Sequence, residues 1–559
     1  MGYSDFNILG DDNRKRTYLL PTKIIWQGTG VSNGESLLNS RVSQIYPRVP
    51  QNATLRNQNV KKGALLLDFG SELVGNLEIL VSRNISNKEN GVSIHIRFGE
   101  SVSEAMSPLG HKYACNDHST RDMTVLLTAN SQQTFGDTGY RFVYLELVDE
   151  DAYIDLAGVR AVMTCRDIPY LGSFSCDDAL LEQIYNTSAY TVHLNMQNML
   201  WDGIKRDRLV WIGDVHPEML AIRTVFGENE IIDDCLKFCA EAYPLPEWPN
   251  RMTTYSFWYL KILWDWYYYT GKKELATELQ PYWKALLKQI FDLIHENDEE
   301  LLIEEEFMAG FFIDWPTRYT EEAKAGVYAL LRLALIAAAN LCELVEDVTL
   351  KQQCLTYANM LKKDNLIHNN RKQIVALLEM ADMVDEDTCK ESLPKQGGHG
   401  MSTFMSYYIL AATSKTVSMD CALSILKEYY GAMINAGATT FWEDFDLDWV
   451  QEGATIDRVL LPGEYDIHGD NGRFCYQGLR HSLCHGWSAG PTAFLAEYVL
   501  GIQILEPGCK KISVTPNLGN LTWAKGTYPT PYGIITVEVH RNGDEVTTTV
   551  NAPKEITIV

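Results

Sequence analysis

The sequence predicts a multidomain α+β protein with an N-terminal antiparallel β-sandwich, a central (α/α)6 barrel and a small C-terminal β-sandwich. The chain has 559 residues, enough for several domains. Apolar residues recur with period two up to about residue 168, with helical period up to residue 501, and with period two again after Pro507. These changes place the domain boundaries at 1–168, 169–504 and 505–559.

The N-terminal part consists of short apolar runs separated by turns. Such runs, 10 to 20 residues apart, are typical of an antiparallel sandwich. The runs cover 64–70, 76–82, 92–100, 123–128, 142–148 and 155–164.

The central part begins at Ser175-Cys176-Asp177-Asp178, which is a helix N-cap pattern. Apolar residues then follow helical spacing, as in 179–196, 217–226 and 321–347. Breakers divide this part into about a dozen helices, several of them paired by short loops such as 270–274. Consecutive pairs suit a closed double ring of helices, and no obvious internal repeat favours a solenoid.

The C-terminal part alternates again in 511–517 and 534–552. Asn542-Gly543-Asp544 lies inside the second run and is typical of a hairpin turn. We therefore expect a small β-domain after the barrel.

Composition limits the partners of this chain. Lys and Arg number 48 against 73 Asp and Glu, a net charge of −25, which disfavours nucleic acid and anionic membrane surfaces. A small neutral substrate is compatible with this charge, and the sequence leaves a homodimer open.

Cysteine usage and the N-terminus indicate no special compartment. The 12 cysteines form no C-x-x-C pair, which argues against a zinc cluster or a disulfide framework. Residues 1–20 lack a basic start followed by an apolar run. As the sequence stands we expect a cytoplasmic protein, or a periplasmic or secreted one if a leader has been trimmed.

The densest polar segment is WDGIKRDRLVWIGDVHPE, residues 201–218. Arginine beside carboxylates provides bidentate hydrogen bonds to another carboxylate or to vicinal hydroxyls of a ligand. The alternative is a solvated loop in which Asp214 caps a helix starting at Val215. That alternative explains Asp214 but not the tryptophans that flank the carboxylates.

A second candidate is Glu443 in GATTFWEDFDLDW, residues 437–449. Tryptophan next to a carboxylate provides the partly apolar surroundings that suit general acid or base chemistry. The alternative is an acidic surface loop, which fits the three following aspartates better than Glu443. Further candidate segments are 256–260, 312–316, 397–404 and 481–490, and their aromatic side chains point to carbohydrate, since aromatic faces stack on sugar rings.

Two other sites are disfavoured. GWSAG at 486–490 matches a hydrolase nucleophile motif, but Ser488 precedes a helical run and the required acid and histidine do not follow in order. His399 and His485 have no partners at metal-ligand spacing, and no D-x-D-x-D run indicates Ca²⁺. We expect no cofactor.

These motifs resemble the bacterial α-L-rhamnosidases of glycoside hydrolase family 78. The family motif D-x-x-x-R-[E/D]-x-x-x-W-x-G-D is matched in every gap by Asp202, Arg206, Asp207, Trp211, Gly213 and Asp214. Segments 437–443, 482–485 and 521–533 are similar to later family motifs, and 65–75, 97–100 and 139–147 resemble its accessory sandwich. The motifs occur in family order over nearly the whole chain.

The resemblance implies an inverting exo-glycosidase that releases terminal α-L-rhamnose from a glycan or glycoside. Asp207 would be the general acid and Glu443 the general base, with their carboxyl groups about 6.5–9.5 Å apart. The other implied residues bind the sugar: Asp202, Arg206 and Asp214 its hydroxyl groups, with His485 near them, and Trp211, Trp258, Trp315 and Trp442 its apolar face.

One departure concerns the acid. Many family members have Glu where this chain has Asp207, whose carboxyl reaches about 1–1.5 Å less far. Two alternatives therefore stay open: an inverting glycosidase for another sugar, or a carbohydrate-binding protein without catalysis.

Overall fold

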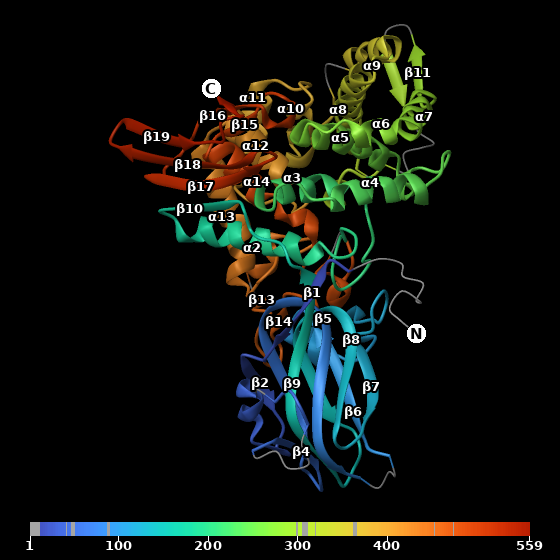
Figure 1. Cartoon of the computed structure of the whole chain (residues 1–559), viewed down its shortest axis with the longest axis vertical. Helices are drawn as coiled ribbons and strands as arrows, with labels where there is room; N and C mark the ends of the chain where they lie inside the picture. Colours follow the sequence, from blue (N-terminus) through green and yellow to red (C-terminus); the bar gives the residue numbers. More distant parts are fainter. Residues whose placement is uncertain are drawn as a thin grey trace.

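The computed structural model describes residues 12–40, 42–45, 51–86, 90–297, 300–303, 311–318, 320–361, 366–451, 453–472 and 475–559. Residues 1–11 lie outside these ranges; they belong to the segment 1–20, which lacks the pattern of a leader peptide. An N-terminal sheet domain adjoins one end of a helical domain, and a smaller C-terminal sheet packs on the side of the helices (Figure 1). The predicted fold class is confirmed.

The N-terminal domain is a nine-stranded antiparallel sheet. Its strands run in the order β3-β4-β9-β5-β8-β6-β7, with β1 on β9 and β2 on β5. Their apolar faces enclose one core that includes Leu67, Ile79 and Ile154. The strands are β1 (Arg14–Leu19), β2 (Lys23–Gln27), β3 (Val31–Ser32), β4 (Ala53–Asn57), β5 (Ala64–Ile85), β6 (Val92–Gly99), β7 (Asp122–Leu127), β8 (Ser131–Leu147) and β9 (Ala152–Arg166), with a short helix α1 (Val102–Met106) after β6.

Two runs expected as separate strands, 64–70 and 76–82, form the single long strand β5. Register shifts against β8 between Asp68 and Leu73 and between Gly75 and Asn76 interrupt the alternation without ending the strand. The turn-like residues between the runs are therefore bulges.

The helical domain is a closed double ring. In the described part of the chain, α3, α5, α8, α10, α12 and α14 each contact the next, and α14 contacts α3. The inner helices are α3 (Val215–Val225), α5 (Thr253–Thr270), α8 (Ala323–Leu344), α10 (Lys372–Met380), α12 (Ser406–Thr416) and α14 (Pro491–Phe494), the last continued by a π-helical turn over Leu495–Val499. The other helices are α2 (Ala179–Asn195), α4 (Ile231–Ala242), α6 (Glu274–Glu278), α7 (Gln280–Phe291), α9 (Val348–Met360), α11 (Glu386–Ser392) and α13 (Met419–Asn435).

The first helix begins as the sequence predicts. Asp178 is the N-cap of α2, and its side chain accepts a hydrogen bond from the Leu180 amide. Helix α8 is long and apolar enough to cross a membrane, but 89% of its most apolar window is buried in the ring. This burial is that of a core helix.

The C-terminal domain recruits strands from outside its own segment. β17 (Trp523–Thr530), β18 (Gly533–Asn542) and β19 (Glu545–Asn551) form a sheet whose fourth strand is β10 (Ser173–Cys176). A second sheet joins β15 (Ile502–Ile504), β16 (Lys511–Val514) and β20 (Thr557–Ile558). The short pairs β11 (Ile294–Asn297) with β12 (Glu300–Ile303) and β13 (Gly453–Ala454) with β14 (Tyr465–Asp466) lie elsewhere.

Strand β10 precedes the barrel in sequence yet pairs with β17 near the C-terminus. The boundary predicted at residue 169 had assigned it to the barrel. The chain thus crosses the C-terminal sheet before it enters the ring of helices (Figure 1).

Candidate active site

The polar segment 201–218 and the Glu443 segment, 437–449, meet at the end of the barrel where inner helices α3, α5 and α8 begin. They enclose a cavity of about 230 Å³. The side chains that line it are those of Asp202, Asp207, Trp211, Asp214, Met252, Tyr255, Phe312, Trp315, Arg318, Glu443, Tyr476, His485 and Trp487. Residues far apart in the sequence are thereby collected around one pocket.

The two carboxylates implied as acid and base line this same pocket. Arg206 lies between them: one guanidinium nitrogen donates to Oδ1 of Asp207 at 2.9 Å and another contacts Oε2 of Glu443. Both carboxylates are buried, with 8% and 3% of their side chains exposed. One positive charge therefore offsets two negative charges where water is largely excluded.

Arg206 is itself held from two sides. Its guanidinium carbon lies 3.5 Å from the ring centroid of Tyr476, and its Nε donates to the Arg480 carbonyl at 2.9 Å. These contacts fix the plane of the guanidinium group and hence the direction in which it meets Asp207 and Glu443.

Asp202 and Asp214 form the inner wall of the pocket. Burial raises the pKa of Asp202 to about 8, and the charge of Asp207 adds to this effect. Burial likewise raises the pKa of Asp214 well above its ordinary value, and the Asp202 charge contributes. Such groups hold a proton near neutral pH and can both donate to and accept from sugar hydroxyls.

Asp214 does not act as the helix cap that the alternative interpretation required. It occupies the N-cap position of α3 but makes no capping hydrogen bond with its side chain. Instead its Oδ1 accepts from the Tyr255 hydroxyl at 2.7 Å. The carboxyl therefore turns toward the pocket.

Gly213 explains why the motif contains a glycine before Asp214. A Cβ at this position would lie 2.3 Å from the Tyr255 ring. The backbone can approach Tyr255, and place Asp214 on its hydroxyl, only without a side chain here.

The aromatic wall differs in part from the expectation. Trp211 and Trp315 line the cavity, together with Tyr255, Phe312 and Trp487. Trp258 and Trp442 do not: each is 1% exposed and belongs to the core. Trp258 packs on His216 and Tyr408 at centroid distances of 4.8 and 5.6 Å, because its position on α5 faces the inside of the ring.

Two lining groups have polar atoms without a partner. Trp315 Nε1 and His485 Nδ1 are buried and make no hydrogen bond to any described residue. Burial lowers the pKa of His485 to about 4, so the ring is neutral, and its Nε2 lies 3.6 Å from Oδ2 of Asp202. Unpaired buried polar atoms in a pocket are suited to a ligand that brings hydroxyl groups.

Ser488, which the sequence disfavours as a nucleophile, uses its hydroxyl in contacts with the backbone. Ser488 is buried, and its hydroxyl contacts the carbonyls of Phe441 and His485 at 3.2 and 2.6 Å. These contacts hold the backbone of the turn at 485–490.

One acidic cluster near the pocket has ligand-like spacing for a metal ion. Among the described residues, Glu100, Glu104 and His468 bring suitable atoms together, as do two other groups, Glu443 with Cys475 and His481, and His399 with Asp446 and Asp448. The Lys205 ammonium lies 2.9 Å from Glu100 and 3.3 Å from Glu104, so a positive charge of the chain already faces both carboxylates.

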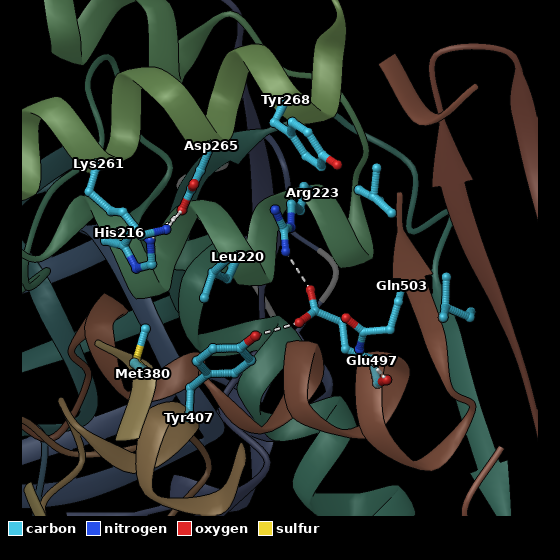
Figure 2. A pocket seen from close by; sticks show the side chains of 12 residues that line it. His216, Leu220, Arg223, Lys261, Asp265, Tyr268, Met380, Tyr407, Glu497 and Gln503 are labelled. Atoms are coloured by element: carbon cyan, nitrogen blue, oxygen red, sulfur yellow. Dashed lines mark hydrogen bonds and ion pairs between the residues drawn. The ribbon is translucent and has the colours of Figure 1, made fainter. Parts of the chain in front are cut away.

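A second cavity of about 220 Å³ lies between the helices and strand β15 (Figure 2). Its charged groups are paired with one another. Asp265 contacts His216 at 2.9 Å and also Lys261, while Glu497 accepts from Arg223 and Tyr407 (Figure 2). Each carboxylate there has a cationic partner of its own, whereas in the first pocket Asp207 and Glu443 share the single guanidinium of Arg206.

Some lining residues carried no recognisable signal in the sequence. Tyr255 and Tyr476 are two of 29 tyrosines, and only the fold brings them to Asp214 and Arg206. Phe312 and Trp487 lie in segments singled out for their aromatic residues, and the structure brings both into the pocket.

Two segments of the chain match models of known protein families. Residues 169–360 match the bacterial alpha-L-rhamnosidase 6 hairpin glycosidase domain, and residues 501–559 match the bacterial alpha-L-rhamnosidase C-terminal domain. Both matching models describe domains of bacterial α-L-rhamnosidases. The resemblance seen in the sequence is therefore confirmed.

Two curated α-L-rhamnosidases, from Alteromonas sp. (strain LOR) and Formosa agariphila, are each 23% identical to this chain. The matches cover 94% and 88% of this chain but 59% and 55% of the relatives. The chain thus spans less than two thirds of the length of these rhamnosidases.

Solved rhamnosidases share the fold. The family 78 enzyme of Bacillus sp. GL1 has a TM-score of 0.73 at 21% identity, over 94% of this chain and 55% of that one. The Streptomyces avermitilis α-L-rhamnosidase complexed with L-rhamnose gives 0.69 at 15% identity, over 98% and 50%. The Klebsiella oxytoca rhamnosidase with rhamnose bound gives 0.66 at 19% identity, over 87% and 96%.

Proposed function

We propose that the chain hydrolyses terminal α-L-rhamnosides with inversion of the anomeric configuration. The observation that carries the proposal is the placement of Asp207 and Glu443 in one buried pocket, on either side of the Arg206 guanidinium. Inverting glycosidases need two carboxyl groups that face a shared site, one as acid and one as base.

In this proposal Asp207 donates a proton to the glycosidic oxygen as its bond to the sugar breaks. Glu443 removes a proton from the water that attacks the opposite face of the ring. Arg206 bonds to both carboxylates in the free protein, and it gives some of these hydrogen bonds to the sugar when the substrate binds.

The lining supports a deoxy sugar. Asp202, Asp214 and His485 offer polar atoms for hydroxyl groups, whereas Trp211 and Trp315 offer apolar surface for a methyl group. A cavity of about 230 Å³ suits one monosaccharide better than a longer chain, which favours exo-action. Two of the solved neighbours are described with L-rhamnose bound.

A panel of p-nitrophenyl glycosides tests the substrate. We expect release of p-nitrophenol from the α-L-rhamnoside at least about 100-fold faster than from α-L-fucoside, β-D-glucuronide or α-D-glucoside. Faster release from another glycoside would change the proposed substrate but leave the proposed acid and base as they are. Binding of rhamnose with no release from any glycoside would instead support a carbohydrate-binding protein.

A further inference from the structure

A histidine of the N-terminal domain reaches the proposed acid. His118 lies on the loop that precedes β7, and its Nδ1 is 3.1 Å from Oδ1 of Asp207. About a third of the His118 side chain, 34%, is exposed, against 8% for Asp207. The imidazole therefore connects the solvent with a carboxyl that solvent hardly reaches.

The loop that carries His118 is fixed on both sides of it. Asp117 pairs with Arg480, whose Nε lies 2.6 Å away, and Ser119 donates to the Lys205 carbonyl at 2.5 Å. His118 itself has φ +66°, in the left-handed region that histidine adopts more readily than most side chains. Three consecutive residues thus dock on the segments that form the active site.

Charged side chains face His118 from the catalytic loop and from its own loop. Asp207 faces it from the catalytic loop, with the Arg206 guanidinium on the same Oδ1 at 2.9 Å. On its own loop stands Asp117, whose charge is taken up by Arg480. An arginine beside a carboxyl favours the ionised form, whereas a general acid must carry a proton.

We propose that His118 and Asp207 act as one acid unit that holds a single proton, with the imidazole as its store. This rests on the proposed function, in which Asp207 protonates the leaving group. Imidazole is the side chain whose ordinary pKa lies closest to neutrality, so it is suited to pass a proton to a neighbouring group and to take one from solvent. His118 acts through Asp207 and is a positioning residue.

The proton transfer balances within the unit. The contacts of His118 and Arg206 both fall on Oδ1 of Asp207. The single proton of the unit passes from imidazolium Nδ1 to the Asp207 carboxylate, and the carboxyl group so formed donates it to the glycosidic oxygen as the C–O bond breaks and its electron pair stays on oxygen. The neutral imidazole then takes a proton from solvent, and Glu443 releases to solvent the proton it took from water.

The test is the pH dependence of kcat/KM for His118→Gln, measured with methyl and p-nitrophenyl α-L-rhamnoside. We expect the alkaline limb to move at least about one pH unit lower than in the wild type. At pH 7.5 the methyl glycoside, a poor leaving group, should lose about 10-fold or more and p-nitrophenol release less than about 3-fold. Added imidazole should restore part of the activity of His118→Ala.

The matched control is His111→Gln, because His111 lies seven residues earlier in the same domain and bonds to Ser107 instead. It should leave the profile unchanged. A His118→Gln profile that superimposes on the wild type, or an equal loss on both substrates without a shift or rescue, would overturn the acid unit alone. A wild type that cleaves neither rhamnoside would overturn the proposed function and the acid unit with it.

Discussion

At the residue scale, the site depends on a few side chains whose polar atoms are positioned before any ligand arrives. Arg206 is bound by Tyr476 and the Arg480 carbonyl, and it in turn orients Asp207 and Glu443. Preorganised groups of this kind need little rearrangement during reaction.

The unpaired indole nitrogen of Trp315 gives the first prediction. Trp315→Phe keeps apolar surface but removes the buried Nε1, so KM for p-nitrophenyl rhamnoside should rise about fivefold, or about 1 kcal/mol. Trp258→Phe is the control, because Trp258 Nε1 is also unpaired among the described residues but lies outside the pocket. Equal KM values for the two variants would refute the assignment.

The hydroxyl of Tyr255 gives the second prediction. Tyr255→Phe removes the donor to Asp214, and we expect kcat/KM to fall about 10-fold, since a buried polar group left without its partner costs about 1–3 kcal/mol. Tyr259→Phe, four residues along α5, removes a hydroxyl that donates to the Leu236 carbonyl at 3.3 Å, its one hydrogen bond among the described residues. Its kinetics should match the wild type; a shared loss would point to general damage of α5.

At the element scale, the N-terminal sheet supports the catalytic loops. Glu100, at the end of β6, accepts from the Leu483 amide at 2.7 Å, and Glu443 donates its own amide to the Ser482 carbonyl at 3.1 Å. Lys205 bonds to the His481 carbonyl at 2.6 Å while it pairs with Glu100. The sheet thus holds the segment 481–485, which carries His485 and accepts the backbone hydrogen bond of Glu443.

Lys205 is the centre of this support. Lys205→Met leaves Glu100 buried without its cation and Glu104 with Arg121 alone, so we expect a loss of about 3–5 kcal/mol in the free energy of unfolding. Thermal unfolding followed by circular dichroism measures it. Lys15→Met, in an exposed pair with Asp167, should change stability by less than about 0.5 kcal/mol; a similar small change for Lys205 would contradict the account.

Sequence patterns predicted individual helices and strands better than they predicted which strands pair. Periodicity located α2 and its N-cap at Asp178 because both depend on neighbours within one turn. The pairing of β10 with β17 joins residues about 350 apart, and no local pattern specifies it. Likewise the carboxylates stood out in the sequence, whereas Trp258 and Trp442, expected at the sugar, are buried and do not line the cavity, because the face of a helix or loop is set by packing.

At the scale of the whole molecule, burial of acidic groups sets the pH dependence of stability. Burial raises the pKa of Glu100 and Asp314 to about 7 and of Asp202 and Asp444 to about 8. Acids with a raised folded pKa bind more protons when folded, so their contribution is present at low pH and is lost as pH rises through 7 to 8.

The stability of the folded chain should therefore fall between pH 6.5 and 8. Buried histidines such as His216 and His468, whose pKa burial lowers to about 4, oppose this trend at its lower end, because unfolded histidine with an ordinary pKa of about 6.5 still binds part of a proton there; above about pH 7.5 they are neutral in both states. Thermal unfolding at pH 6.5, 7.2 and 8 measures it. A melting temperature that rises over this range would show that these carboxyls ionise without cost.

The most direct measurement is proton NMR of the sugar first released from p-nitrophenyl α-L-rhamnoside by the wild type, Asp207→Asn and Glu443→Gln. The account predicts that the β-anomer appears first with the wild type and that both variants, folded as judged by circular dichroism, lose at least about 1000-fold in kcat. Initial release of the α-anomer, or a variant that keeps wild-type activity, would contradict the assignment of Asp207 and Glu443 as acid and base.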